Sequence, residues 1–212
     1  MLLAFSHTTP STIYFLSYIA SLKHTARLIE DGFSSRMGEN KPLMKYNDKF
    51  LIEYTLDTIS KCNFKDRVIV TQYKAIKEIG EKLNFKVVIN QQPNKGQSES
   101  IKLGIKNCKE SEGYMFFVGD QPLLEGKDIE KLIEVFNEDT SYIVIPQCKG
   151  KCGNPVIYPK KYKKDILNLE GDKGGKSIIK SSDKIKYVNV CEDTLFDIDY
   201  IDDFNNLLKR GT

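Results

Sequence analysis

The loop at residues 32–41 holds the groups in this chain that are best suited to contact phosphates. Gly32 and Gly38 let backbone N–H groups approach an anion closely, because glycine lacks the Cβ atom that would block them. Arg36 offers a planar fork of donors that matches phosphate oxygens, and Lys41 adds a compact positive charge. A solvated basic turn has the same composition, so the loop alone is consistent with both interpretations.

Three aspartates follow predicted strands and have the chemistry of a metal site. Asp120 comes directly after the apolar run 114–118, where a carboxylate can hold Mg²⁺ while substrate phosphates complete the coordination. Asp197 and Asp199 are two residues apart, so on an extended segment they point the same way and are placed to join Asp120. Helix capping is the alternative interpretation of Asp120 and of Asp199.

Three further segments combine turn residues with polar side chains. The segment 96–100 precedes a predicted helix, and Ser98 is a candidate N-cap. A helix N-terminus with free N–H groups also suits a nucleotide or a phosphate, so both interpretations stay open. The turns at 153–156 and 171–176 hold more Gly, Asp and Lys than a connection requires, although flexible surface loops have a similar composition.

Strand and helix patterns alternate along the chain from about residue 42. Apolar residues at helical spacing predict helices at 49–61, 73–83, 100–109, 127–137, 160–168, 175–181 and 200–209. Short apolar or β-branched runs predict strands at 67–71, 86–89, 114–118, 142–145, 155–158 and 185–190. This alternation predicts a single α/β domain with a mostly parallel sheet, helices on both faces and ligands at the carboxyl ends of the strands.

The bulk composition excludes several classes of protein. The 212 residues carry a net charge of +3, which is too small to indicate nucleic acid as a partner. No apolar run approaches the roughly 20 residues of a membrane span, so we expect a cytoplasmic protein. Five scattered cysteines indicate a reducing compartment. Cys148 and Cys152 lack the second ligand pair of a zinc site and are expected to be a turn residue and a strand-end residue.

Taken in order, these loops resemble the MobA-like nucleotidyltransferases, and in particular their molybdenum cofactor cytidylyltransferase branch. The family's opening pattern is roughly L-A-A-G-x-S-x-R-M-G-x-x-K, and the positions that match it are Gly32, Ser34, Arg36, Met37, Gly38 and Lys41. The later matches are Gly96, Ser100, Gly119, Asp120, Pro122, residues 153–156, Asp197, Asp199 and Asp203.

The resemblance implies a Rossmann-like fold and the transfer of a nucleotidyl group, in which an acceptor phosphate attacks the α-phosphorus of a nucleoside triphosphate. The implied catalytic residues are Arg36, Lys41 and Asp120. The implied ligands of Mg²⁺ are Asp120, Asp197 and Asp199. The implied nucleotide contacts are Gly32, Ser34, Ser35, Arg36, Gly38, Lys41, Gln97, Ser98 and Ser100. We assign the acceptor to Asn154, Asp172 and Lys176.

The choice of nucleotide depends on the segment 96–100. The guanylyl branch usually has a G-P-L-A-G pattern there, and its absence favours CTP. The acceptor would then be molybdenum-loaded molybdopterin, and the clients of the product would be molybdenum hydroxylases. GTP, another phosphorylated acceptor, and a catalytically silent module that binds a nucleotide or cofactor are the alternatives.

The chain departs from the family pattern before residue 32. We therefore divide it into an atypical segment, 1–31, and a nucleotidyltransferase domain, 32–212. Ile29-Glu30-Asp31 stands where the family has a hydrophobic strand ending in small residues, and its two carboxylates would repel a triphosphate. We expect the segment 1–31 to be foreign sequence that replaces the first strand. Lys176 stands where the family commonly has arginine.

Overall fold

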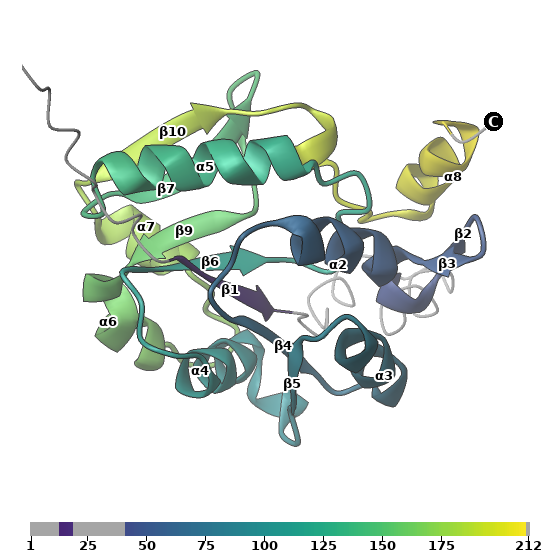
Figure 1. Cartoon of the computed structure of the whole chain (residues 1–212), viewed down its shortest axis with the longest axis horizontal. Helices are drawn as coiled ribbons and strands as arrows, with labels where there is room; N and C mark the ends of the chain where they lie inside the picture. Colours follow the sequence, from purple (N-terminus) through teal and green to yellow (C-terminus); the bar gives the residue numbers. More distant parts are fainter. Residues whose placement is uncertain (1–12, 19–40, 211–212) are drawn as a thin grey trace, which may run out of the picture.

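The computed structural model describes residues 13–18 and 41–210, which form one α/β domain around a central sheet (Figure 1). The sheet order is β10 (Ile185–Asn189), β7 (Ile143–Cys148), β9 (Val156–Pro159), β6 (Gly113–Phe117), β1 (Ile13–Tyr18), β4 (Arg67–Thr71) and β5 (Lys86–Ile89). A short strand, β8 (Lys151–Cys152), pairs with β7. Outside this sheet, β2 (Lys45–Tyr46) and β3 (Lys49–Phe50) form a two-stranded hairpin.

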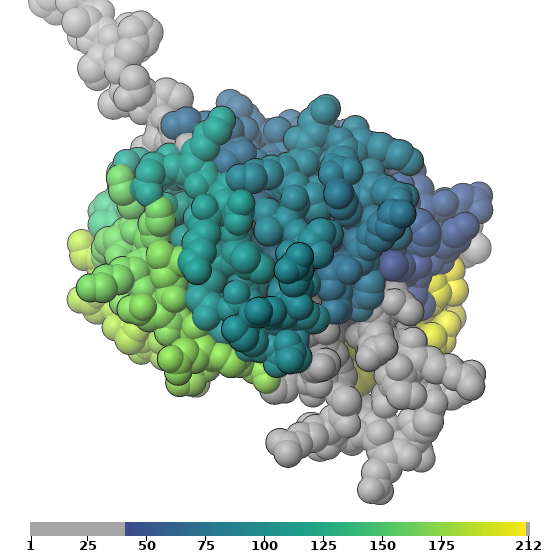
Figure 2. All heavy atoms as spheres, turned by 90° about the horizontal axis from the view of Figure 1, so that it is seen from below, coloured from purple at the N-terminus to yellow at the C-terminus, as the bar shows by residue number. Residues whose placement is uncertain are grey.

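Helices cover both faces of the sheet (Figure 1). The α-helices are α2 (Leu51–Lys61), α3 (Lys74–Lys82), α4 (Gln97–Asn107), α5 (Gly126–Glu138), α6 (Lys163–Leu167), α7 (Lys176–Ser181) and α8 (Ile201–Arg210). The short 3-10 turns are η2 (Lys41–Leu43), η3 (Pro93–Lys95), η4 (Lys160–Tyr162) and η5 (Asp193–Leu195). Figure 2 shows the green segment that contains α6 and α7 beside the teal surface of α4. In the described part of the chain, no helix is long and apolar enough to cross a membrane.

Side chains of β4, β6 and β9 alternate between two apolar cores. One core lies between the sheet and the helices α2, α3 and α5. It contains Ile69, Met115 and Ile157 from the strands and Leu56 and Phe136 from the helices. Neighbouring residues of the same strands point to the opposite face and join a second core under α4, α6 and α7. These residues are Val68, Val70, Tyr114, Val156 and Tyr158. Successive residues of a strand point to opposite faces, so burial on both faces explains why these strands are continuous apolar runs.

The predicted sheet is confirmed as mostly parallel. β1 pairs in parallel with β4 and β6, β4 with β5, and β10 with β7. β9 instead runs antiparallel to both β6 and β7. The chain between β7 and β9 makes only the small β7–β8 hairpin and has no helix, whereas a parallel crossover needs a dozen or more residues.

Two local expectations need correction. Cys148 was expected in a turn, but it is the last residue of β7, and Cys152 is the last residue of β8. The turn between the two strands is formed by Lys149 and Gly150, with φ of 50° and 79°. Residues 13–18 form β1, which pairs at the centre of the sheet in the register Phe15 to Arg67 and Ile13 to Gly113. A first strand is therefore present within the segment 1–31. Residues 25–31 lie outside the described residues, and the division at residue 31 stays a prediction.

Gly113 allows a test of how tightly the core is packed. A Cβ atom at Gly113 would lie 2.5 Å from Cζ of Phe136, whereas one at Gly126 would come no closer than 3.9 Å to Sγ of Cys62. We expect Gly113→Ala to lower the free energy of unfolding by about 1–3 kcal/mol through overpacking. Gly126→Ala, at the start of α5, should be neutral or slightly stabilising. Urea denaturation measures both; equal effects of the two substitutions would contradict this account of the packing.

Candidate functional site

Three segments that are far apart in sequence meet at the carboxyl ends of the parallel strands. Asp120 lies in the loop after β6, Asp199 precedes α8, and Lys41 begins η2. The backbone N–H of Ile198 donates to the carbonyl of Asp120 at 3.1 Å, which fixes two of these segments to each other. This is the crevice in which open α/β sheets bind their ligands.

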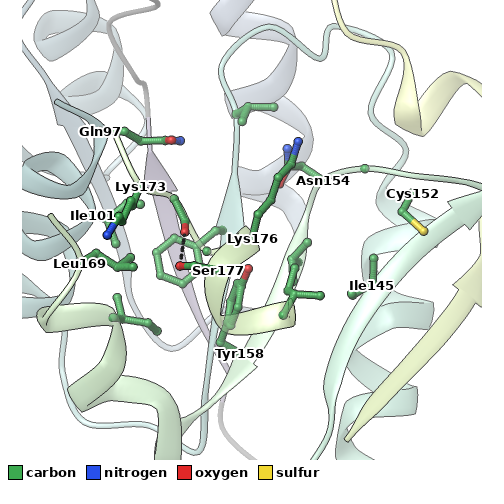
Figure 3. A pocket seen from close by; sticks show the side chains of 18 of the residues that line it. Gln97, Ile101, Ile145, Cys152, Asn154, Tyr158, Leu169, Lys173, Lys176 and Ser177 are labelled. Carbon is green, nitrogen blue, oxygen red and sulfur yellow. Dashed lines mark hydrogen bonds between the residues drawn. The ribbon is translucent and has the colours of Figure 1, made fainter. Parts of the chain in front are cut away.

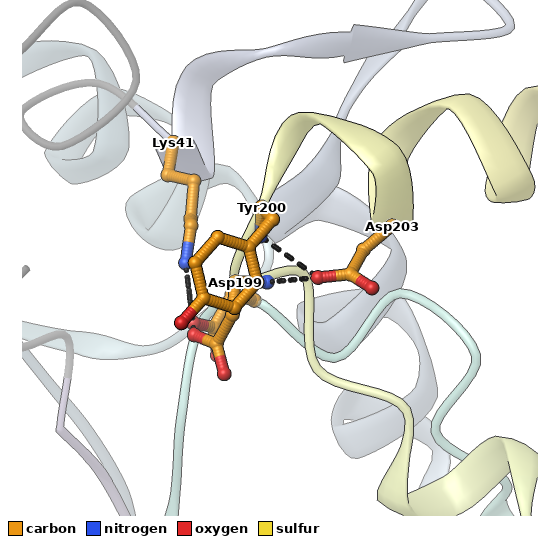
Figure 4. Close-up of polar contacts among 5 residues, drawn as sticks. Lys41, Asp199, Tyr200 and Asp203 are labelled. Carbon is orange, nitrogen blue, oxygen red and sulfur yellow. Dashed lines mark hydrogen bonds and ion pairs between the residues drawn. The ribbon is translucent and has the colours of Figure 1, made fainter. Parts of the chain in front are cut away.

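Lys41 is the charged centre of the site. It is 2% exposed, and its Nζ atom lies 3.2 Å from Oδ1 of Asp199 and 3.7 Å from Oδ2 of Asp120 (Figure 4). A buried ammonium group is costly unless it is paired, so the two carboxylates hold it in place. The structure therefore brings together Lys41, Asp120 and Asp199.

The three predicted metal ligands carry more negative charge than Lys41 neutralises. Burial raises the pKa of Asp120, an effect that Lys41 opposes and Asp199 reinforces. Burial, followed by the charges of Asp120 and Asp199, raises the pKa of Asp197 to about 7. Oδ1 of Asp197 is buried and has no hydrogen-bond partner among the described residues. A cation at this site would relieve these unfavourable charges.

The aspartates are not arranged as a tight metal cage in this structure. Within the described ranges, the three side chains whose ligand atoms lie within 4.8 Å of one another are Glu125, Cys191 and Asp193. The spacing of Asp120, Asp197 and Asp199 is wider than that. The ammonium group of Lys41 lies between two of the three, which accounts for part of this separation.

Asp120 and Asp199 do not cap helices, which was the alternative interpretation of both. The N-cap of α5 is Glu125, five residues beyond Asp120 in the chain. At α8, Oδ2 of Asp203 accepts hydrogen bonds from the backbone N–H groups of Asp199 and Tyr200, at 3.0 and 2.8 Å (Figure 4). A third-position acid that caps the helix start in this way leaves the Asp199 side chain to contact Lys41.

A cleft of about 850 Å³ is lined by Asp197 and by Lys176 and Ser177 of α7, and Figure 3 labels the last two. All three residues assigned to the acceptor, Asn154, Asp172 and Lys176, line it. Gln97, one of the predicted nucleotide contacts, also lines it from the start of α4. The cleft thus joins the acidic end of the site to the glycine-containing turn at 171–176.

The start of α4 differs from the prediction. The helix begins at Gln97 with Gly96 as its N-cap, so Ser98 is not the cap. The N–H of Ser98 donates to the carbonyl of Gly171 at 3.0 Å. Gly96 has a φ of 86°, and a Cβ atom there would lie 2.5 Å from the carbonyl carbon of Gly171. The close approach of these two loops therefore determines where α4 begins.

Ser98 and Ser100 point into the protein, being 1% and 7% exposed. Nδ2 of Asn90 donates to Oγ of Ser100 at 2.8 Å, and Oδ1 of Asn90 accepts the N–H of Gln92 at 2.8 Å. The side chains of Asn90 and Ser100 thus hold the loop between β5 and α4 in shape. Contact of Ser98 and Ser100 with a nucleotide stays a prediction. The remaining predicted contacts, Gly32, Ser34, Ser35, Arg36 and Gly38, lie outside the described residues.

Sequence reasoning missed the part played by Gln121. This residue is 0% exposed, and its Nε2 atom donates to the carbonyls of Asn154 and Thr194 at 3.2 and 3.3 Å. Gln121 therefore ties the Asp120 loop to the entry of β9 and to η5. The available signal was its position in Gly119-Asp120-Gln121-Pro122. The sequence does not identify the tertiary hydrogen-bond partners of an amide side chain.

The domain family described as MobA-like NTP transferase domain matches residues 32–185. The chain belongs to this family. A protein from Pyrococcus horikoshii named probable molybdenum cofactor guanylyltransferase is 25% identical over 174 residues, covering 80% of this chain and 85% of that protein. A 3-deoxy-manno-octulosonate cytidylyltransferase from Bdellovibrio bacteriovorus is 31% identical over 108 residues, covering 50% of this chain and 43% of that protein.

The fold has a counterpart among solved structures. A nucleotidyl transferase from Methanothermobacter thermautotroptrophicus superposes with a TM-score of 0.73 at 17% identity, covering 94% of this chain and 97% of that one. This likeness confirms the Rossmann-like architecture. The family match makes nucleotidyl transfer the reaction class of this MobA-like protein.

Asp197 gives a pH-dependent test of the site's electrostatics. Its carboxyl pKa is raised, so its protonated form stabilises the fold at low pH, and this contribution is lost as the pH rises through about 7. We expect Asp197→Asn to increase the free energy of unfolding near pH 8 by on the order of 1 kcal/mol, and to change it little near pH 5. The exposed Asp183→Asn should show no such difference in urea denaturation. A stabilisation that is equal at both pH values would contradict the raised pKa.

Proposed function

We propose that this protein transfers the CMP unit of CTP onto molybdenum-loaded molybdopterin, with Mg²⁺ as the metal. A phosphate oxygen of the acceptor attacks the α-phosphorus, the bond from that phosphorus to the bridging oxygen breaks, and pyrophosphate leaves. The observation that carries the proposal is the ammonium group of Lys41, held between Asp120 and Asp199 at the carboxyl ends of the parallel strands, beside a cleft that Asp197 lines. Positioning and charge neutralisation supply most of the catalysis in such transfers.

The carboxylates fit the proposed Mg²⁺. Hard divalent cations take oxygen ligands, and Mg²⁺ is commonly bound by one or two carboxylates together with substrate phosphates. Asp120 would be the principal ligand. Asp197, whose Oδ1 atom is buried without a partner among the described residues, and Asp199 would lie beside it. The bound metal would neutralise charge on the phosphates, while Lys41 would hold Asp120 and Asp199 in position and add a second positive charge.

Two observations bear on the base of the nucleotide, and they favour different answers. The segment 96–100 lacks the pattern usual in the guanylyl branch, which favours CTP. The name of the Pyrococcus horikoshii relative, a probable guanylyltransferase, favours GTP. GTP is therefore the second candidate donor, and the reaction is otherwise the same.

The acceptor would occupy the cleft beyond the carboxylates. Asn154, Asp172 and Lys176 line it, and Lys176 supplies a single positive charge for an acceptor phosphate where a guanidinium would offer two parallel hydrogen bonds. A dinucleotide product of molybdopterin would serve molybdenum hydroxylases as client enzymes, and these are the partners that we propose.

Calorimetric titration with the four nucleoside triphosphates tests the donor. We expect CTP to bind only in the presence of Mg²⁺, because the carboxylates would otherwise repel the triphosphate. GTP, ATP and UTP should bind more weakly, by about tenfold or more, which is about 1.4 kcal/mol. If GTP bound more tightly than CTP, GTP would become the proposed donor in place of CTP. Binding of every nucleotide without Mg²⁺ would contradict the metal site.

Asp120→Asn separates an enzyme from a silent nucleotide-binding module. In an enzyme, loss of this carboxylate should reduce pyrophosphate release with molybdopterin as acceptor by about 100-fold or more. The free energy of unfolding should fall by about 1–3 kcal/mol, because the buried Lys41 loses one of its two carboxylate partners and keeps Asp199. Turnover is therefore compared at a temperature at which both proteins are folded. Asp183→Asn, on an exposed turn, is the matched control for turnover. Unchanged pyrophosphate release in Asp120→Asn would argue for the silent module.

A further inference from the structure

The side chain of Tyr158 lines the cleft, and the proposed chemistry does not use it. Tyr158 lies in β9 and is 4% exposed. The ring of Phe116 meets its ring edge-on, with centroids 5.4 Å apart and an interplanar angle of 84°. Figure 3 shows the hydroxyl oxygen directed toward the segment that carries Lys176 and Ser177. The ring is thus held rigidly, with its polar end at the cleft.

The hydroxyl of Tyr158 makes no hydrogen bond to any residue that the structure describes. Tyr158 lines the cleft, so a ligand bound there can accept the hydrogen bond that no described residue takes. Ser177, the nearest labelled hydroxyl in Figure 3, donates to the carbonyl of Gly174 at 3.2 Å instead. Burial raises the pKa of Tyr158, so the group is a neutral hydroxyl that can donate a hydrogen bond.

Gly175 makes room for this hydroxyl. A Cβ atom at Gly175 would lie 2.1 Å from the Tyr158 hydroxyl oxygen. The backbone of Gly175, with φ of −61° and ψ of −14°, is helical and accessible to any residue, so conformation does not require a glycine there. The requirement for glycine comes from space, and the hydroxyl is the group that takes up that space.

We propose that the Tyr158 hydroxyl donates a hydrogen bond to a carbonyl oxygen or ring nitrogen of the acceptor, and so makes Tyr158 a specificity-determining residue. The inference rests on the proposed function, because it takes the acceptor to be a pterin. Ile145, Val156 and Ile179 add apolar walls to the cleft, which suit a flat, uncharged ring system.

The test uses 6-hydroxymethylpterin as a probe of the ring site in the full-length protein. By calorimetry, Tyr158→Phe should weaken its binding by about tenfold, the effect of losing one well-placed hydrogen bond. Binding of CTP or GTP with Mg²⁺ should be unchanged, and the thermal midpoint should not fall, because the hydroxyl has no partner to lose. Tyr162→Phe is the matched control, since the Tyr162 hydroxyl lies 2.6 Å from Oγ of Ser182. This control should lower stability and leave pterin binding unchanged.

Each contrary result has a distinct meaning. A loss of stability in Tyr158→Phe like that in Tyr162→Phe would show a structural hydroxyl and overturn the inference. The inference would also be overturned if the unmodified protein did not bind the pterin, or if the unmodified protein and Tyr158→Phe bound it equally. Failure to bind any nucleotide with Mg²⁺ would count against the proposed function itself. Nucleotide binding that persists without an effect of Tyr158 on the pterin would refute this inference alone.

Discussion

The buried ammonium group of Lys41 is the constraint on which the site depends. A cation that is removed from water must be surrounded by negative charge, and here the charge comes from Asp120 and Asp199, the latter 158 residues away in the chain. The sheet brings the loop after β6 to the same edge as the segment before α8. The hydrogen bond from Ile198 to Asp120 and the two from Gln121 then hold these segments together. The fold and the charge pairing therefore support each other, and the surplus of carboxylates is left for a ligand.

The sequence was sufficient to predict the layered α/β architecture because both faces of the sheet are buried. Continuous apolar runs such as residues 67–71 and the helical spacing of 127–137 identify elements without reference to neighbours. The direction of β9 was beyond prediction, since direction depends on the connection, and a run of four apolar residues looks the same either way. β1 was missed because residues 13–18 have no recognisable period, and their position is fixed by pairing with β4 and β6.

The same distinction applies to the site. Lys41, Asp120 and Asp199 were selected on residue type and on their match to the family's motifs, and Asp120 also on its place just after an apolar strand. Ser98 and Ser100 were assigned to the nucleotide on position alone, yet their packing depends on Asn90 and on the loop at Gly171, which no local pattern reveals. Gln121 and Tyr158 acquire their significance only from tertiary neighbours. Residue type and strand order thus located the charged end of the site, while the shape of the cleft required the structure.

The reversed direction of β9 has a consequence for how this site can change. Because β9 starts rather than ends at the ligand edge, Cys152, Asn154, Tyr158 and the turn before α7 follow one another closely, and together they supply much of the cleft. The charged end, by contrast, is assembled from three distant parts of the chain. Under the proposed function, substitutions within one continuous stretch of about thirty residues, the span of a typical supersecondary unit, would therefore alter the choice of acceptor while the reaction itself is conserved. On that proposal, the architecture separates the part of the chain that handles the transferred group from the part that binds its acceptor.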